Sequence, residues 1–378
     1  MAGHRLAPVY ADDLLAPWHE QVMSLLPPLE VFDAHTHIGA SDPDGFRCAP
    51  GELLAALAPS GSRAVVFPMH EPDGYPPAND EALRVAAQSG GRLVAFCRVD
   101  PRDDPVAEVR RCLAAGARGI KLHPRAERFA MLDPGVRAIV AVADEARAPV
   151  LIHAGRGIPA LGAHVVELAH EYPHARFILA HAGVSDLAWI GSAAAEHPNL
   201  FFDTAWYSSA DLRALLTLVP PGQVLYATDI PYGAPAQSMV IVFRNALQAG
   251  LSGEQIASVA GAQLERLVAA DDTIDVGPAL GPVGLRPDPL LDRVGYYLVC
   301  AFATLLSGNE PAEFCELTRL ACQVGGDAPQ APICRSIVAL LDLTEQLEGG
   351  ETLAARLPSL HLLVVAAALA ATPDVPVQ

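Results

Sequence analysis

The strongest constraint on the fold is a series of eight short apolar segments, each followed by a helix-like pattern. Successive segments begin 23 to 33 residues apart, which leaves room for one strand, one helix and two loops. Strands that alternate with helices are parallel, so eight such units predict an α/β protein, a (β/α)8 TIM barrel, over residues 30–270. The predicted strands are residues 31–37, 64–69, 93–99, 119–123, 150–153, 177–181, 200–204 and 224–228.

Helical patterns also occupy the residues outside the predicted barrel. Residues 1–29 hold one amphipathic helix, at about residues 12–26. Residues 271–378 begin with a Pro- and Gly-rich linker and continue as several helices, with 5 Arg and 14 acidic residues. The apolar spacing in this tail is typical of packed helices. We therefore expect a C-terminal helical domain that caps the barrel or joins copies of the chain in a homo-oligomer.

Net charge and apolar run lengths limit the partners. A formal charge of −18 argues against nucleic acid or an anionic membrane surface. The apolar runs at 296–306 and 362–372 are shorter than the roughly 20 residues of a membrane span, and the first thirty residues do not resemble a signal peptide. Seven cysteines without a CxxC pair indicate reduced thiols. We expect a cytoplasmic protein that binds a small-molecule substrate.

Polar side chains close four of the predicted strands. His35 and His37 lie two residues apart on the first strand, so both imidazoles point to the same face. The fifth strand ends at His153, the sixth at His181 and the eighth at Asp229. In a barrel all these strand ends meet at one face, where such enzymes have their active sites. A single His-X-His pair is weak evidence, but four such ends together indicate a metal site.

Several motifs resemble the amidohydrolase superfamily. They are FDAHTH, GIKLHP, LIHAG, FILAHAG and YATDIPYG. The resemblance is to the amidohydrolase-related branch, which includes the aminocarboxymuconate-semialdehyde decarboxylase-like enzymes, and it covers residues 30–270. The helix that follows the eighth strand, EQIASVAGAQLERLV, also resembles the post-barrel helix of that branch, although its usual Gly-Asn pair appears here as Gly261 and Ala262.

The resemblance implies one divalent metal ion held by His35, His37, His153 and Asp229. Imidazole nitrogen and carboxylate oxygen suit Zn²⁺ best and also suit Mn²⁺, Fe²⁺ or Co²⁺. By the same resemblance, Asp229 takes a proton from metal-bound water and later gives it to a leaving group. His181 then polarises a substrate carbonyl or moves a proton, or else it has a structural role.

Lys121 is the single lysine in the chain, against 24 arginines. Alternation along the predicted fourth strand places Lys121 and His123 on the inward face. Three interpretations remain open. The ammonium binds a substrate carboxylate or oxyanion; or Lys121 is carbamylated and bridges a second metal, as in binuclear members of the superfamily; or it pairs with Asp229 or Asp33. The GIKLHP motif resembles mononuclear members, which favours the first over the second.

The loops after the strands supply further candidate pocket residues. We expect Lys121, His123, Arg156 and Trp206 to bind substrate or to serve a second metal. Weaker candidates at the same ends of other strands are His70, Arg98, Arg125, Tyr207 and Tyr232.

The predicted activity is hydrolysis of a small-molecule amide, lactone or related bond by a metal-activated water, with Asp229 as the base. The alternative is metal-dependent, non-oxidative decarboxylation of an unsaturated or aromatic carboxylic acid, which relatives in this branch perform with a similar ligand set. Phosphotriester hydrolysis is tied to the binuclear variant. A non-catalytic scaffold with an acidic helical tail is a further possibility, against which the complete ligand set argues.

Overall fold

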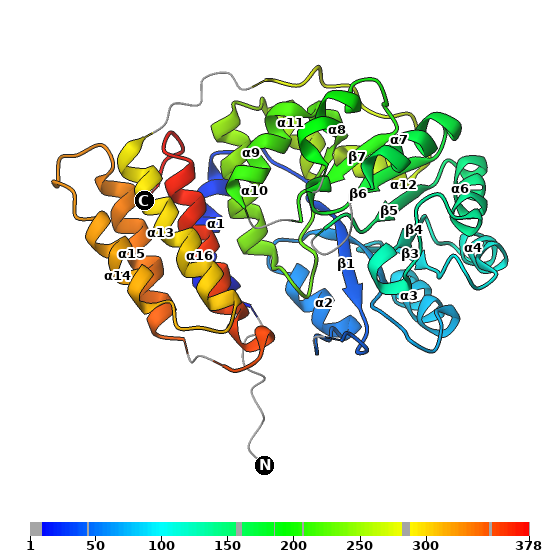
Figure 1. The fold of residues 1–378 in the computed structure, drawn as a ribbon, viewed down its shortest axis with the longest axis horizontal. Coiled ribbons are helices and arrows are strands. Elements are labelled where there is room, and N and C mark those ends of the chain that lie inside the picture. The colour runs from blue at the N-terminus through cyan, green and yellow to red at the C-terminus, as the bar shows by residue number, and fades with distance from the viewer. Residues whose placement is uncertain are drawn as a thin grey trace, which may run out of the picture.

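Eight parallel strands follow one another in sequence order to form a barrel, with helices outside them (Figure 1). This computed structural model describes residues 10–43, 45–155, 161–184, 186–205, 208–281, 288–347 and 350–377. The predicted (β/α)8 barrel is confirmed. The strands are β1 (Phe32–Ile38), β2 (Arg63–Pro68), β3 (Leu93–Arg98), β4 (Gly119–Leu122), β5 (Pro149–Ile152), β6 (Arg176–Leu179), β7 (Leu200–Asp203) and β8 (Val224–Leu225).

The segment after β8 closes the barrel against β1. The backbone N–H of Asp229 donates to the His35 carbonyl at 2.9 Å, and that of His37 donates to the Ile230 carbonyl at 2.8 Å. The regular part of β8 is shorter than the predicted strand 224–228. The next three residues explain the difference, because their backbone N–H groups donate outside the strand ladder. Tyr226 donates to the Val259 carbonyl, Ala227 to the Thr204 hydroxyl and Thr228 to the Asp33 carboxylate.

Large apolar side chains fill the barrel interior, among them Phe67, Phe96 and Phe201. Gly119 leaves room for this packing at the start of β4, since a Cβ atom there would lie 2.6 Å from the Phe96 ring. Ile120 belongs instead to the core between the strands and the outer helices. Because side chains alternate along a strand, Lys121 points inward, as the sequence predicts.

Helices between the strands cover the outside of the barrel. Proline stands at the first turn of several of them, where its missing N–H costs nothing. The helices are α2 (Pro50–Leu57), α3 (Pro76–Gln88), α4 (Pro105–Ala114), α5 (Pro124–Glu127), α6 (Pro134–Ala146), α7 (Gly162–Glu171), α8 (Leu187–Ala194), α9 (Ser209–Leu218), α10 (Pro235–Ala249), α11 (Gly253–Ala257) and α12 (Gln263–Val268), with short turns η1 (His181–Gly183), η2 (Pro221–Gln223) and η3 (Ser258–Ala262).

A group of four tail helices packs beside the barrel of the same chain (Figure 1). The N-terminal helix α1 (Asp12–Ser24) packs on α10, and its Trp18 donates to Ser336 of the tail at 2.7 Å. The buried Arg244 of α10 donates to the backbone carbonyls of Thr372, Val375 and Pro376 at 2.9–3.1 Å. The tail helices are α13 (Pro289–Leu306), α14 (Ala312–Ala321), α15 (Ala331–Glu345) and α16 (Leu353–Ala371).

Two of these tail helices, α13 and α16, are long and apolar enough to cross a membrane by length and composition alone. Within the apolar windows, 61% of the α16 residues and 22% of the α13 residues are buried inside the protein. The core helix of a soluble protein passes the same test, so the finding is weak evidence for a membrane span.

Candidate metal centre and pocket

Three predicted metal ligands converge at the C-terminal ends of the strands. The Nε2 atoms of His35 and His37 lie 3.2 Å apart, and each is 3.1 Å from Oδ1 of Asp229. Ligands bound at 2.0–2.1 Å to a tetrahedral ion are separated by about 3.4 Å. Burial lowers the pKa of both histidines well below its usual value, which keeps them neutral, as metal binding requires. Donor types and spacing therefore fit a divalent metal ion.

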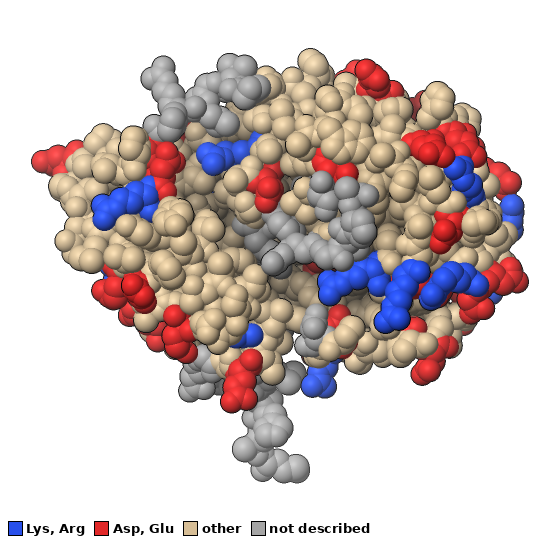
Figure 2. Space-filling view, viewed as in Figure 1, with Lys and Arg blue, Asp and Glu red and all other residues tan. Residues whose placement is uncertain are grey.

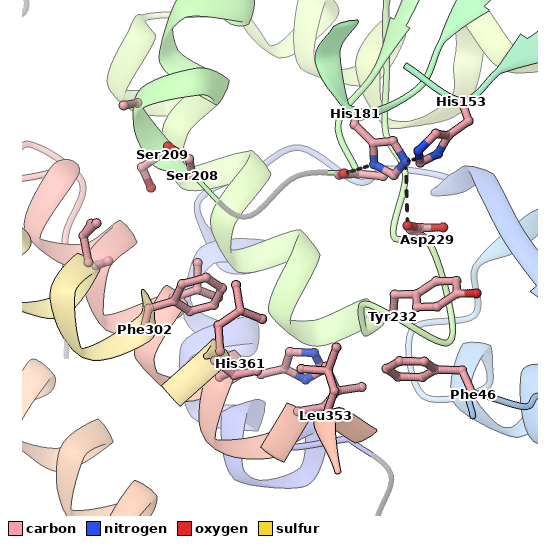
Figure 3. A pocket seen from close by; sticks show the side chains of 18 of the residues that line it. Phe46, His153, His181, Ser208, Ser209, Asp229, Tyr232, Phe302, Leu353 and His361 are labelled. Carbon is pink, nitrogen blue, oxygen red and sulfur yellow. Dashed lines mark hydrogen bonds and ion pairs between the residues drawn. The ribbon is translucent and has the colours of Figure 1, made fainter. Parts of the chain in front are cut away.

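His153 and His181, which follow β5 and β6, lie near Asp229 (Figure 3). His181 Nε2 lies 3.9 Å from Asp229 Oδ2 and 3.1 Å from His153 Nδ1. His35, His181 and Asp229 form a group whose ligand atoms all lie within 4.8 Å of one another. The arrangement brings the five predicted residues together, but it sets His181 between Asp229 and His153. Either histidine could therefore complete the ligand set.

His181 and Asp229 both adopt left-handed backbone conformations, with φ of 58° and 63°. This region is unfavourable for residues with a Cβ atom and costs of order 1 kcal/mol or more. Backbone hydrogen bonds hold both residues, since the His181 N–H donates to Asp203 and the Asp229 N–H to the His35 carbonyl. Such conformations are concentrated at functional sites.

Asp203, at the end of β7, is a site residue that the sequence analysis missed. Its Oδ2 is 2.8 Å from His35 Nδ1, and its Oδ1 accepts from the His181 N–H at 2.8 Å. A carboxylate in this position fixes the imidazole so that Nε2 faces the metal site. A signal was present, because Asp203 closes an apolar strand as His153, His181 and Asp229 do.

Lys121 is fully buried against the metal donors. Its Nζ lies 3.1 Å from His35 Nε2 and 4.8 Å from the centre of the Phe67 ring. Burial lowers its pKa to about 7, while the charge of Asp229 acts in the opposite direction. Asp33, one of the predicted structural partners of Lys121, accepts hydrogen bonds from Thr228.

His123 stacks on His153 with ring centres 3.9 Å apart, and its Nδ1 accepts from the Ala126 N–H at the start of α5. Beside it, the buried Arg98 donates to Glu127 at 2.7 Å, and the Tyr75 hydroxyl donates to the same carboxylate. No motif or spacing in the sequence pointed to Tyr75 and Glu127 as neighbours of the site, since their contact joins segments 52 residues apart. Arg156, Trp206 and Tyr207 lie outside the described residues.

A cavity of about 920 Å³ opens from these side chains. The surface is hollowed between the tail and the barrel, and basic side chains follow the barrel side (Figure 2). His70, Arg125 and Tyr232, three weaker predictions, line the cavity together with Lys121. Across it lie Phe302, Leu353 and His361 of the tail (Figure 3). The tail therefore forms one wall of the pocket of its own chain.

Solved structures of similar fold include aromatic acid decarboxylases. The 5-carboxyvanillate decarboxylase from Sphingomonas paucimobilis has a TM-score of 0.52 at 16% identity, over 64% of this chain and 99% of that one. The 2,6-dihydroxybenzoate decarboxylase from Rhizobium has a TM-score of 0.52 at 14% identity, over 65% and 100%. The 5-carboxyvanillate decarboxylase from Novosphingobium aromaticivorans, complexed with manganese, has a TM-score of 0.51 at 13% identity, over 64% and 96%. At these identities the likeness concerns the fold.

The sequence itself matches one family model, described as amidohydrolase, over residues 32–257. No curated relative matches the sequence. The family match confirms the resemblance found in the strand-end motifs and contains all five predicted ligands and proton carriers. Because it spans more than half of the chain, this protein belongs to the amidohydrolase family.

Proposed function

We propose that this amidohydrolase-family enzyme removes CO2 from an unsaturated or aromatic carboxylic acid without oxidation, using one divalent metal ion. The observation that carries the proposal is the buried Lys121, whose Nζ lies 3.1 Å from His35 Nε2. An ammonium beside the metal donors would hold a substrate carboxylate through a charge-assisted hydrogen bond. Hydrolysis of a neutral amide or lactone, the reaction first predicted from the sequence, needs no buried cation there.

The comparisons support this alternative over hydrolysis, since the matched folds named above include aromatic acid decarboxylases. One of those enzymes was crystallised with manganese. The nitrogen and oxygen donors here suit Mn²⁺ as well as Zn²⁺, so we propose either ion as the cofactor.

Each side chain would have a defined part in the reaction. His35, His37 and Asp229 would hold the ion, which when bound would orient the carboxylate and stabilise developing negative charge. As the C–C bond breaks, its electron pair stays on the substrate carbon and CO2 leaves. That carbon takes up one proton, which the Asp229 and His181 pair would hold beside it. Lys121 would bind the departing carboxylate.

The proposal is tested with the full-length protein loaded with Mn²⁺ or Zn²⁺. Hydroxybenzoic acids are supplied, and CO2 and the decarboxylated arene are measured together. We expect equal amounts of both products. Turnover should fall by at least a hundredfold in His35→Ala and in Asp229→Asn, whereas Asp272→Asn, an exposed carboxylate 90% accessible to solvent, should match the unaltered protein.

Hydrolysis is measured in parallel with small amides and lactones in H2¹⁸O. Incorporation of ¹⁸O into a product, with no CO2 from any acid, would reject decarboxylation in favour of hydrolysis. Unchanged metal content and turnover in both site variants would reject the metal centre itself.

A further inference from the structure

The part of the cavity farthest from the metal donors is apolar and is built by the tail. We call this part the apolar arm. Its walls come from α13 and α16, which lie beyond residue 257, where the family match ends. The residues that define the apolar arm are Leu291, Phe302, Leu357, Leu360, His361 and Val364.

The cavity is larger than a simple aromatic acid requires. Sites for drug-sized ligands measure about 300–1000 Å³, so a volume of about 920 Å³ is near the upper limit. An aromatic acid bound at Lys121 would fill the barrel end only. Leu357, Leu360 and Val364 are buried by the fold yet line the remaining space, so an apolar ligand group there would meet side chains that are already ordered.

The two ends of the cavity differ sharply in chemistry. The barrel end presents Arg98, Lys121 and the proposed metal donors. The tail end presents mainly aliphatic and aromatic side chains, such as Phe302 and Leu353 (Figure 3), with Asp292 and His361 as polar residues among them. A ligand that fills both ends must be amphipathic, with an anionic head and a hydrocarbon part. Each methylene that enters the apolar arm should strengthen binding by about fourfold.

His361 is the polar exception in the apolar arm. Its side chain is 1% exposed and faces the backbone of Tyr232, and neither ring nitrogen makes a hydrogen bond of ordinary geometry with any of the described residues. The ring instead stacks on Tyr10, with centres 6.3 Å apart and planes 19° from parallel. Buried polar groups nearly always have a partner. Both His361 nitrogens are enclosed, so a ligand atom would form a hydrogen bond with one of them after the ring turns toward the cavity.

We propose that the apolar arm binds a hydrocarbon substituent of the substrate acid, and that His361 positions this substituent through one hydrogen bond. The inference rests on the proposed decarboxylation for the nature of the head group. It adds the substrate class, an amphipathic carboxylic acid with one polar atom along its apolar part. It also assigns the tail a direct part in substrate selection.

The first test compares two acids with the metal-loaded, full-length enzyme. The probes are 2,6-dihydroxybenzoate and its 4-hexyl derivative, and kcat/KM for CO2 release is measured for each. We expect at least a tenfold preference for the hexyl acid. Leu357→Trp, which fills the apolar arm, should reduce this preference to near one. Val364→Phe serves the same purpose if Leu357→Trp does not fold.

A matched control is Leu320→Trp on α14. Leu320 is 55% exposed and does not line the cavity, so this variant should keep the preference of the unaltered protein. Equal kcat/KM for the two acids would overturn the inference while leaving decarboxylation intact.

A binding measurement separates failure of the inference from failure of the proposed function. Decanoate and benzoate are titrated calorimetrically into the metal-loaded enzyme without turnover. Binding of decanoate at least tenfold tighter, lost in Leu357→Trp, would support the apolar arm even if no acid is decarboxylated. Equal affinity for both would overturn it whatever the enzyme's activity.

The role of His361 is tested with hexyl probes that carry a hydroxyl at successive chain positions. One position should bind at least tenfold tighter than its neighbours, and His361→Phe should abolish that advantage while plain hexyl binding persists. A series without a favoured position, or one unchanged in His361→Phe, would show that His361 only packs against Tyr10.

Discussion

The surroundings of Lys121 give a physical reason why this position holds the single lysine of a chain that has 24 arginines. Lys121 Nζ fits between His35 Nε2 and the face of Phe67, at 3.1 Å and 4.8 Å. A compact ammonium on a flexible stem fits this gap, whereas a planar guanidinium is larger and carries donors in several directions. The buried position therefore requires lysine, although the rest of the chain uses arginine.

The first prediction concerns metal stoichiometry. We expect about one divalent ion per chain, because we propose that Lys121 acts as an ammonium and not as a carbamate that bridges a second ion. Lys121→Met should keep that ion and raise KM for a carboxylate substrate by at least tenfold, since the anion loses its partner. Mass spectrometry of the metal content and steady-state kinetics provide the readouts. Two ions per chain, one of them lost in Lys121→Met and restored by short carboxylic acids, would instead establish a carbamate bridge.

The second prediction concerns Asp203, which orients His35 through a 2.8 Å contact. Asp203→Asn keeps the shape of the side chain but removes its charge, and changes of this kind lower metal affinity by about 10- to 100-fold. Competition with a fluorescent chelator measures the affinity. The exposed Asp272→Asn is the control. An unchanged affinity in Asp203→Asn would mean that Asp203 has no part in metal binding.

The third prediction concerns acid stability. Burial lowers the pKa of His361 to about 4 from 6.5, so the unfolded chain binds more protons than the folded protein between these values. Stability is therefore lost as pH falls from 6.5 towards 4, by about 2 kcal/mol at pH 5. His361→Phe keeps the ring stacked on Tyr10 and removes the proton. Urea titrations at pH 7 and pH 5 give the free energy of unfolding of both proteins. The loss of unfolding free energy from pH 7 to pH 5 should be about 2 kcal/mol smaller in His361→Phe than in the unaltered protein.

Among the elements, strands were the most predictable. Their apolar runs are continuous because both faces are buried, so seven strands lie close to the predicted positions. The eighth is shorter, since the N–H groups of Tyr226, Ala227 and Thr228 donate to the Val259 carbonyl and to the side chains of Thr204 and Asp33 instead of to a neighbouring strand. Alternation on β4 correctly placed Lys121 inside. The contact of Asp203 with His35 could not be predicted, since 168 residues separate the two, although the position of Asp203 at a strand end was visible in the sequence.

The fourth prediction tests the packing of β4 against β3. In Gly119→Ala the new Cβ would lie 2.6 Å from the Phe96 ring, and overpacking of this kind costs about 1–3 kcal/mol. Gly51→Ala is the matched control, because Gly51 lies in α2 with no atom within 4 Å of its Cβ position. It should stabilise the helix by about 0.5–1 kcal/mol. Urea unfolding compares the two, and equal stabilities would contradict the close packing.

At the scale of the whole molecule, the tail completes the pocket, a feature that sequence periodicity could not predict. Apolar spacing shows that a helix has a buried face, but not which surface covers it. The relevant contacts join distant segments, as where Arg244 of α10 bonds to Thr372, 128 residues later. The convergence of the proposed metal donors was predictable because the C-terminal ends of all strands of a barrel lie at one face.

The fifth prediction concerns the connection between barrel and tail. Arg244→Met removes the donor for three backbone carbonyls, and buried acceptors left without a partner cost about 1–3 kcal/mol each. We expect a loss of at least about 3 kcal/mol in unfolding free energy. Arg335→Met, an exposed arginine on α15, is the control. A small effect of Arg244→Met, equal to that of the control, would show that these bonds do not hold the tail.

The closure of the barrel through Asp229 and His35 bears on the order of folding events. The metal ligands come from β1 and from the segment after β8, nearly two hundred residues apart, so no complete binding site exists until the first and last strands have joined. Closing so long a loop is slow relative to local helix formation. Uptake of the proposed ion would therefore be a late event, and its rate after dilution from denaturant would report when the first and last strands join.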